Sequence, residues 1–473
     1  MSFLRHKGEK QKDASAHTQS HVTTSIYFEH ISAPNARIYV ILRAVVSAVR
    51  QSTNSEAPKH SPGSFRGRVP RRYIRSTCKR DPTSKFFRAQ RAHVPTYSAH
   101  RIQQAIEYAD SIAPEQSLQD GTRSSPELCI GVPSVQRDGI SYLKPTLGSL
   151  QHGLIAEERA RLRFVIFLAH SDQTKHRDYG QPWLISMADV LPSYQDDPAN
   201  LALAKVMERN HSHGIKAKFD YSIVLEECQK TGAPYTLMVE DDVVFLDGWR
   251  HRIMHALNVA TTKSWGAGYT DFLYLRLFYY EGLLGWNSES WLTYLASSLT
   301  VTIGTLCLLV LTRRYIPSTR LYLTRLTMFL ITLVFTPLLI VLFFTAGGNC
   351  MMPQPDGVHL MSDNACCGQG LVFPRTTVIN ELLPHFRNQR LSEVPTDSFI
   401  EEYAEETGAL RWALTPVVMQ HIGGQSSHGI PRGQYGNMTG GHIWNFGFEE
   451  NDAGMLAAEH MEDSSSHQNR RDD

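Results

Sequence analysis

Apolar runs and amphipathic stretches alternate along the chain between residues 127 and 278. Four apolar runs predict buried strands, at 128–132, 162–169, 236–246 and 271–278. Three intervening stretches have the spacing of helices, at 143–158, 202–213 and 220–231. Because strands and helices alternate, the pattern predicts an open, largely parallel α/β sheet of Rossmann-like type. Ligands of such sheets bind at the carboxyl ends of the strands.

Two long uncharged runs then interrupt this pattern, at 290–312 and 326–348. Each has the roughly 20 apolar residues that a helix needs to cross a bilayer. The connecting loop, 313–325, carries four arginines and no acid, whereas the outer flanks carry acids. Basic loops stay cytosolic, so we expect a transmembrane hairpin that turns in the cytosol, with both outer ends in the lumen. One lumenal domain then continues on both sides of the hairpin.

Five parts follow from this pattern. They are a poorly ordered basic and polar region at 1–120, the first part of the α/β domain at 121–289, the hairpin at 290–348, the second part of the domain at 349–450 and a polar tail at 451–473. The apolar piece at 38–49 is interrupted by Arg43 and is too short to span a membrane. It also lacks a cleavage-site pattern, so we expect no N-terminal targeting segment. In the second part, 397–407 predicts a helix and 414–421 a strand that ends at His421.

Three consecutive acids, Glu240, Asp241 and Asp242, interrupt the apolar run at 236–246. Buried carboxylates are costly unless a cation or hydrogen bonds compensate them. Carboxylate oxygens suit Mn²⁺ or Mg²⁺, which take their remaining ligands from water and substrate phosphates. The alternative is a solvated acidic turn without a metal. His421 is a further candidate ligand, although an isolated histidine at a strand end is more often structural.

The composition gives no indication of nucleic-acid binding or of a cysteine zinc site. A formal net charge of +1 over 473 residues does not indicate a nucleic-acid partner. The seven cysteines include no pair with the spacing of a zinc site. In an oxidising lumen Cys350 can pair with Cys366 or Cys367, and unpaired buried thiols are the equally open alternative. The sequons at Asn210 and Asn437 agree with a lumenal placement.

Two motifs and the hairpin between them resemble a known enzyme family. The segment VEDDVVFLDGW resembles the acid motif of Golgi glycosyltransferases of the GT-A type, and PVVMQHIGGQSS resembles the carboxyl-terminal motif of the N-acetylglucosaminyltransferase IV family. With a two-span hairpin between these motifs, the chain resembles the post-GPI-attachment-to-proteins GalNAc transferases. The resemblance implies a Golgi membrane enzyme with a GT-A-like domain. An enzyme of this family would transfer an N-acetylhexosamine to the glycan of GPI-anchored proteins in the bilayer, and the expected donor is UDP-GalNAc. It also implies an additional N-terminal span, which this sequence does not predict.

The resemblance assigns roles to individual residues. Asp242, with Asp241 and Glu240, would hold Mn²⁺ or Mg²⁺ against the diphosphate of a UDP-sugar, and His421 would complete the ligand shell. The loop at 131–137 follows the first strand, so Pro133 and Arg137 are candidates for contact with the nucleotide. The general base for an inverting transfer would be Asp397, with Glu401 one turn later as the second candidate. A helix cap is the competing interpretation of Asp397.

Two other functions remain open from the sequence. One is a transferase that acts on N-glycans, which the second motif permits. The other is a non-catalytic membrane scaffold with a transferase fold. The identity of the donor sugar among GalNAc, GlcNAc and Gal is also left open, because the shape of a pocket decides it.

Overall fold

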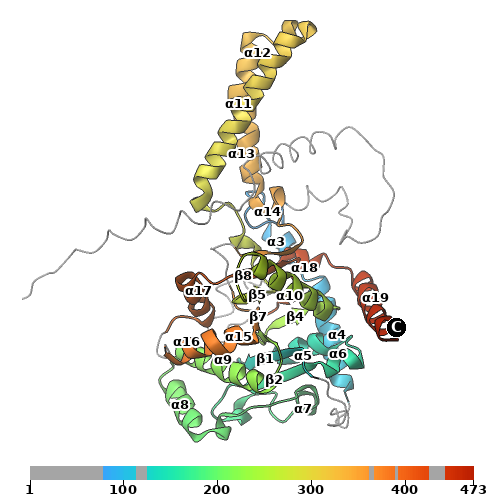
Figure 1. The fold of residues 1–473 in the computed structure, drawn as a ribbon, viewed down its shortest axis with the longest axis vertical. Helices are drawn as coiled ribbons and strands as arrows, with labels where there is room; N and C mark the ends of the chain where they lie inside the picture. Colours follow the sequence, from blue (N-terminus) through green and yellow to red (C-terminus); the bar gives the residue numbers. More distant parts are fainter. Residues whose placement is uncertain (1–77, 113–124, 362–366, 389–392, 425–442, 473) are drawn as a thin grey trace, which may run out of the picture. The chain divides into compact units, whose positions relative to one another are not determined.

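The computed structural model describes residues 78–112, 125–361, 367–388, 393–424 and 443–472, which all fall within one unit at 65–473. A seven-stranded sheet has the order β2-β1-β3-β7-β5-β8-β6, and β4 and β9 form a second, two-stranded sheet (Figure 1). The strands are β1 (Leu128–Ser134), β2 (Leu162–Leu168), β3 (Tyr235–Val239), β4 (Val243–Phe245), β5 (Tyr274–Arg276), β6 (Gly357–Leu360), β7 (Gly370–Pro374), β8 (Arg411–Thr415) and β9 (Met419–His421).

The large sheet is mixed, with five strands in one direction and two against it. Strand β1 runs parallel to β2 and β3, and β5 runs parallel to β8. Strand β7 is antiparallel to both β3 and β5, and β6 is antiparallel to β8. The predicted α/β class is therefore confirmed. The two reversed strands both come from the part of the chain that follows the hairpin.

Side chains of the strands alternate between two apolar cores, one on each face of the sheet. Leu128, Ile130 and Val132 of β1 belong to one core, whereas Cys129 belongs to the other. A strand buried on both faces is apolar throughout, which explains the continuous runs in the sequence. The first core is completed by α4 (Tyr97–Ser111), α5 (Leu143–Gln151), α7 (Pro182–Met187) and α10 (Trp249–Gly266). The second is completed by α8 (Pro198–Arg209), α9 (His213–Lys230), α16 (Leu383–Asn388) and α17 (Thr396–Thr407).

Two predicted strands are each divided in two, and this correction matters for the site. The run at 236–246 leaves the large sheet after Val239 and enters the small sheet at Val243. The run at 414–421 likewise leaves after Thr415, passes a cis Thr415–Pro416 bond and resumes at Met419. The divided halves, β4 and β9, then pair with each other. The acidic triplet is therefore a turn between two sheets.

Two helices within the described residues are long and apolar enough to cross a membrane, Ser288–Tyr315 and Arg325–Ala346. The most apolar window of the first is not buried at all, and that of the second is 11% buried, unlike core helices. They comprise α11 (Trp291–Tyr315), then α12 (Arg325–Leu330), a π-helical turn (Ile331–Phe335) and α13 (Thr336–Ala346). Pro337 lacks an N–H and so cannot make one hydrogen bond of a regular α-helix. The π-helical turn just before it accommodates this missing bond.

The prediction that residues 1–120 are poorly ordered is wrong for 78–112. Helix α4 packs in the core with Tyr97 and Arg101 buried, and Arg101 Nε donates to the Phe245 carbonyl at 2.9 Å. Short helices complete the described chain: α3 (Ala89–Ala92), α6 (Ala156–Ala160), α14 (Gly348–Met351), α15 (Arg375–Thr377) and α18 (Phe446–Glu449). The expected polar tail forms α19 (Ala453–Asp472), with Leu456 and His460 buried. The apolar piece at 38–49 and the sequon at Asn437 lie outside the described residues.

The cysteine expectation also needs correction. Cys350 pairs with Cys78, and neither Cys366 nor Cys367 is its partner. A second disulfide joins Cys129 of β1 to Cys228 of α9. The first of these bonds links the N-terminal segment to the residues that directly follow the hairpin.

Candidate functional site

The acidic turn lies where the two sheets meet. The Glu240 N–H donates to the Gln369 carbonyl at 3.0 Å, and the Ile422 N–H donates to the Asp242 carbonyl at 2.8 Å. Residues on both sides of the hairpin therefore hold the turn. Because Val243 is paired with His421 in the small sheet, the imidazole lies beside the turn, with its Nε2 3.4 Å from Asp242 Oδ2.

Three side chains converge at this point. One ligand atom each from Glu240, Asp242 and His421 lies within 4.8 Å of the others. Asp242 and His421 are buried, at 6% and 8% exposed. Two carboxylates and an imidazole are a donor set that suits Mn²⁺, and Asp242 Oδ1 is buried with no hydrogen-bond partner among the described residues. The residues present therefore fit a divalent cation.

Asp241 has different partners from its neighbours. Its Oδ2 accepts a hydrogen bond from Ser134 Oγ at 2.5 Å, and its Oδ1 lies 2.7 Å from a terminal nitrogen of Arg137. The other terminal nitrogen of Arg137 lies 3.1 Å from Asp242 Oδ2. Of the four predicted metal ligands, the structure thus brings three together, and Asp241 instead holds Arg137. Arg137 Nε is buried without a partner among the described residues.

The electrostatics indicate a deficit of positive charge. Burial and the nearby Asp242 carboxylate raise the pKa of Glu240 to about 8. Burial also raises the pKa of Asp241 against the opposing effect of Arg137. Burial alone would raise the pKa of Asp242, but the nearby His421 and Arg137 outweigh this effect and lower the pKa to about 2. When all three carboxylates are ionised, their charge exceeds that of the Arg137 guanidinium and a protonated His421 together, and a bound cation would neutralise the remainder.

The glycines after His421 shape the turn around this carboxylate. A Cβ added at Gly423 would lie 2.2 Å from Asp242 Oδ2 and 3.0 Å from His421 Nε2, so that position needs glycine. The N–H of Gly424 donates to the Tyr142 hydroxyl at 2.9 Å, and the Arg137 guanidinium lies over the Tyr142 ring at 5.3 Å.

Several residues at the ends of β1 and β2 were missed by the sequence reasoning. His176 Nε2 lies 3.0 Å from Ser134 Oγ, which places the imidazole behind the Ser134–Asp241 contact. Burial lowers the pKa of His176 and, together with Lys216, lowers that of His170 to about 4, so both are neutral at pH 7. Ser134 was detectable as the last residue of a strand. Pro133 precedes it in β1 and is partly exposed.

The two candidate bases, both on α17, have different surroundings. Asp397 lies in the first turn but is not the N-cap, which is Pro395. A Cβ at Gly368 would lie 3.4 Å from Asp397 Cβ and 3.8 Å from Glu240 Oε1, so Gly368 is next to both Asp397 and the acidic turn.

Glu401, one turn later, has strong partners. It accepts from the Tyr274 hydroxyl at 2.6 Å, from Arg411 at 2.8 Å and from Arg276. A hydroxyl and two guanidiniums already occupy this carboxylate, so an acceptor hydroxyl would have to displace one of these partners.

Comparison with known proteins gives this arrangement a context. Residues 128–420, more than half of the chain, match the family described as GPI-N-acetylgalactosamine transferase PGAP4. The chain belongs to this family. The match begins at the first residue of β1 and ends one residue before His421, so it includes the acidic turn, the hairpin and both candidate bases. Helices α4 and α19 lie outside it.

The chain is also similar to an alpha-1,3-mannosyl-glycoprotein 4-beta-N-acetylglucosaminyltransferase-like protein, MGAT4D, of Mus musculus. The two are 23% identical over 186 residues, which is 34% of this chain and 49% of the relative. The chain thus spans about half the length of the curated relative. Both predicted resemblances, to GPI-GalNAc transferases and to the N-acetylglucosaminyltransferase IV type, are confirmed.

Proposed function

We propose that this protein transfers an N-acetylhexosamine, GalNAc in the first instance, from a UDP-sugar to the glycan of GPI anchors. Membership of the GPI-N-acetylgalactosamine transferase family supports the donor and acceptor classes. The observation that carries the chemistry is the convergence of Glu240, Asp242 and His421, with Asp242 Oδ1 buried and without a hydrogen-bond partner in the part of the chain that the structure describes. The mixed sheet with its acidic turn at the end of β3 is consistent with a domain of GT-A type.

The cation would be Mn²⁺ or Mg²⁺, held by Asp242, Glu240 and His421. When bound, such an ion neutralises the charge that develops on a departing diphosphate. Asp241 has a supporting role beside these three ligands, because its 2.7 Å contact fixes the position of the Arg137 guanidinium. Arg137 would then face an anionic group near the turn, because its Nε has no partner among the described residues and can donate to a phosphate oxygen.

The uridine end of the donor is assigned to the residues after β1. Pro133 and Arg137 lie at the carboxyl end of this strand, where open α/β sheets bind their ligands. His170, which is neutral and partly exposed, is suited to hydrogen bonding with an uncharged base or ribose, whereas His176 is buried with its two ring nitrogens bonded to Ser134 Oγ and the Asp178 N–H. His170 Nε2 already accepts from the Gln136 N–H at 2.8 Å, which fixes its ring.

Asp397 is the proposed general base. It would accept the proton of an acceptor hydroxyl while that oxygen bonds to the anomeric carbon and the bond from this carbon to the diphosphate breaks, its electrons leaving with UDP. Within the described residues one carboxylate oxygen of Asp397 accepts from the Ser398 N–H at 2.8 Å, which orients the group. A single base opposite the leaving group gives an inverted anomeric centre.

The two apolar helices support attachment to a membrane, and we propose the Golgi membrane with the catalytic domain in the lumen and the hairpin loop in the cytosol. A GPI acceptor is itself confined to a leaflet. A site attached to the same bilayer by its own chain therefore meets the acceptor with a reduced entropic cost.

The proposal is tested by supplying purified protein in detergent with a panel of UDP-sugars and two acceptors, a GPI glycan and a soluble N-glycan. We expect transfer of GalNAc to the GPI glycan alone. Transfer to the N-glycan alone would select the activity suggested by the N-acetylglucosaminyltransferase-like relative. Folded protein that neither binds nor turns over any UDP-sugar would indicate a scaffold.

A further inference from the structure

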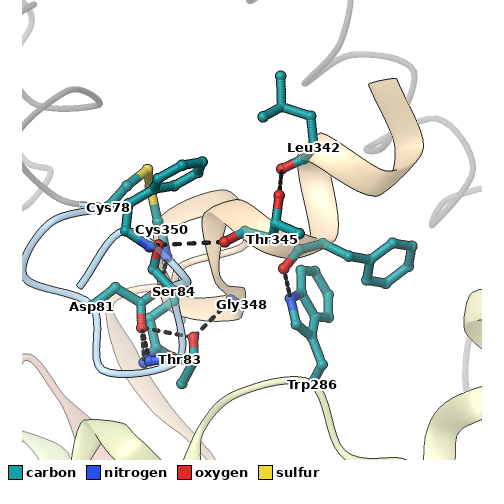
Figure 2. The surroundings of a disulfide bond; sticks show 12 residues. Cys78, Asp81, Thr83, Ser84, Trp286, Leu342, Thr345, Gly348 and Cys350 are labelled. Atoms are coloured by element: carbon teal, nitrogen blue, oxygen red, sulfur yellow. Dashed lines mark hydrogen bonds between the residues drawn. A yellow bond between two sulfur atoms is a disulfide. The ribbon is translucent and has the colours of Figure 1, made fainter. Parts of the chain in front are cut away.

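Two segments of the chain contact the outer end of the second apolar helix (Figure 2). One is at residues 78–94, and the other contains Trp286. We call residues 78–94 the collar. The Cys78–Cys350 disulfide bonds the collar to α14 across 272 residues of sequence. The Lys85 N–H donates to the Thr345 carbonyl in the last turn of α13 at 2.9 Å, and the Gly348 N–H donates to Thr83 Oγ1 at 2.8 Å. The collar is therefore fixed at the point where this helix ends.

Asp81 organises this attachment. Its Oδ2 accepts from the Cys350 N–H at 2.8 Å, and its Oδ1 accepts from the Thr83 N–H at 2.8 Å and the Asn349 side-chain amide at 3.3 Å. The approach is so close that a Cβ at Gly347, where φ is 104°, would lie 2.3 Å from Asp81 Oδ2. The contact is thus made of directional hydrogen bonds from two backbone N–H groups and one side-chain amide to the buried Asp81 carboxylate.

Aromatic side chains mark the same level of the hairpin. Trp286 Nε1 donates to the Phe344 carbonyl at 2.8 Å. Its ring centroid lies 4.8 Å from that of Phe344 and 5.4 Å from that of Tyr294. Tryptophan and tyrosine concentrate where a membrane meets water, because one part of each ring is apolar and the other forms hydrogen bonds. The end of α13 that holds the collar is therefore at the expected depth of an interface.

The outward face of the collar combines an apolar ring with cations. Phe86 is 49% exposed, and Lys85, Arg88 and Arg91 are exposed around it. Among the described residues, none of these three cations is paired with a carboxylate. Arg80 differs, because it pairs with Glu450 at 3.2 Å and lies over the Phe446 ring, which ties the collar to α18.

We propose that the collar is a membrane-surface element, in which Phe86 enters the interface and Lys85, Arg88 and Arg91 bind the phosphates of phospholipid headgroups. This inference rests on the proposed membrane-spanning hairpin. A disulfide and hydrogen bonds fix the collar to the end of a membrane-spanning helix. The exposed face of the collar would therefore lie next to the lipid surface. Its three cations, which have no carboxylate partner among the described residues, are the kind of side chain that anchors a protein at the level of the headgroup phosphates. The disulfide and Arg80 then transmit this contact to the catalytic domain and limit its tilt over the bilayer.

Site-directed spin labelling of the full-length protein in phosphatidylcholine–phosphatidylserine nanodiscs tests this proposal. Cys307, the free cysteine among the described residues, is first replaced by serine. Single labels are then placed by Phe86→Cys, by Leu299→Cys in α11 and by Ile185→Cys in α7, positions that are 49%, 52% and 55% exposed. Collisions with lipid-soluble oxygen and with a water-soluble nickel complex report the surroundings of each label.

We expect the labels at 299 and 86 to favour oxygen and the label at 185 to favour nickel. Replacing Lys85, Arg88 and Arg91 together by glutamine should shift the label at 86 toward nickel. A label at 86 that behaves like the one at 185, that is shielded from both reagents by protein, or that ignores the charge change would overturn the collar proposal. If the label at 299 also favours nickel, the hairpin itself is not in the bilayer and the membrane placement fails with it.

Discussion

Replacing Gly423 by alanine gives the most direct perturbation of the site without removing any of its polar groups. The added Cβ would lie 2.2 Å from Asp242 Oδ2 and 2.8 Å from its Cγ. Ordinary contacts of this kind are about 3.5 Å, so the carboxylate must move by roughly 1 Å. A 1 Å displacement of a group that positions substrate lowers turnover by about 100-fold, or about 2.7 kcal/mol in the activation barrier.

The neighbouring glycine provides a matched control. Among the described residues, a Cβ at Gly424 would meet the Tyr142 hydroxyl alone, at 3.6 Å, which is an ordinary contact. Gly424→Ala should therefore keep its activity within about threefold. The assay is release of UDP from the donor against Mn²⁺ concentration, with the melting temperature of each variant measured in parallel. Equal activity of Gly423→Ala and Gly424→Ala, both folded, would refute the assignment of Asp242 to the metal site.

Four further substitutions separate the roles of other residues. Asp241→Asn should raise the KM for the donor roughly tenfold, because it releases Arg137, and leave the Mn²⁺ requirement within about twofold. Arg276→Gln should cost about 3 kcal/mol in the free energy of unfolding, since it leaves Glu401 short of a buried partner. Arg387→Gln, at an exposed ion pair, should cost less than about 0.5 kcal/mol. Hydrogen-bonded ion pairs to Asp247 and Glu158 raise the pKa of His460 from 6.5 to about 9. The stabilisation of the folded protein by His460 is therefore fully present below pH 6.5 and is lost as the pH rises through 9. His460→Gln should flatten this part of the profile of melting temperature against pH.

Each of these expectations has a contradicting outcome. A large rise in the Mn²⁺ requirement of Asp241→Asn would return Asp241 to the metal ligands. Equal stabilities of the Arg276→Gln and Arg387→Gln variants, from chemical denaturation, would show that the buried network contributes little. An unchanged pH profile of His460→Gln would mean that the docking of α19 does not depend on this imidazole.

The sequence predicted the site better than the local path of the chain through it. The apolar runs on either side of Glu240 and Asp242 were correct, and so was the proximity of His421. The division of each run between two sheets was not visible, because Val239 and Val243 are both fully buried. Apolar periodicity is the same whether a buried chain continues straight or turns.

Other features depend on contacts that no local pattern encodes. The basic composition of the N-terminal region suggested disorder, yet Arg101 is fully buried because the carbonyls of Phe245 and Ser149 accept from its guanidinium. A disulfide partner 272 residues away, Cys78 for Cys350, follows only from the folded arrangement. Of the two candidate bases, the helix periodicity placed Asp397 and Glu401 on one face, but only the surrounding arginines distinguish them.

The most direct test is transfer of labelled GalNAc from UDP-GalNAc to a GPI glycan by the purified protein, with Mn²⁺ or a chelator, for the wild type and for Asp242→Asn. We predict transfer by the wild type that the chelator abolishes and that Mn²⁺ restores, and a loss of at least about 100-fold in the variant. Transfer that survives both the chelator and the substitution would contradict a metal-dependent transferase at Glu240, Asp242 and His421.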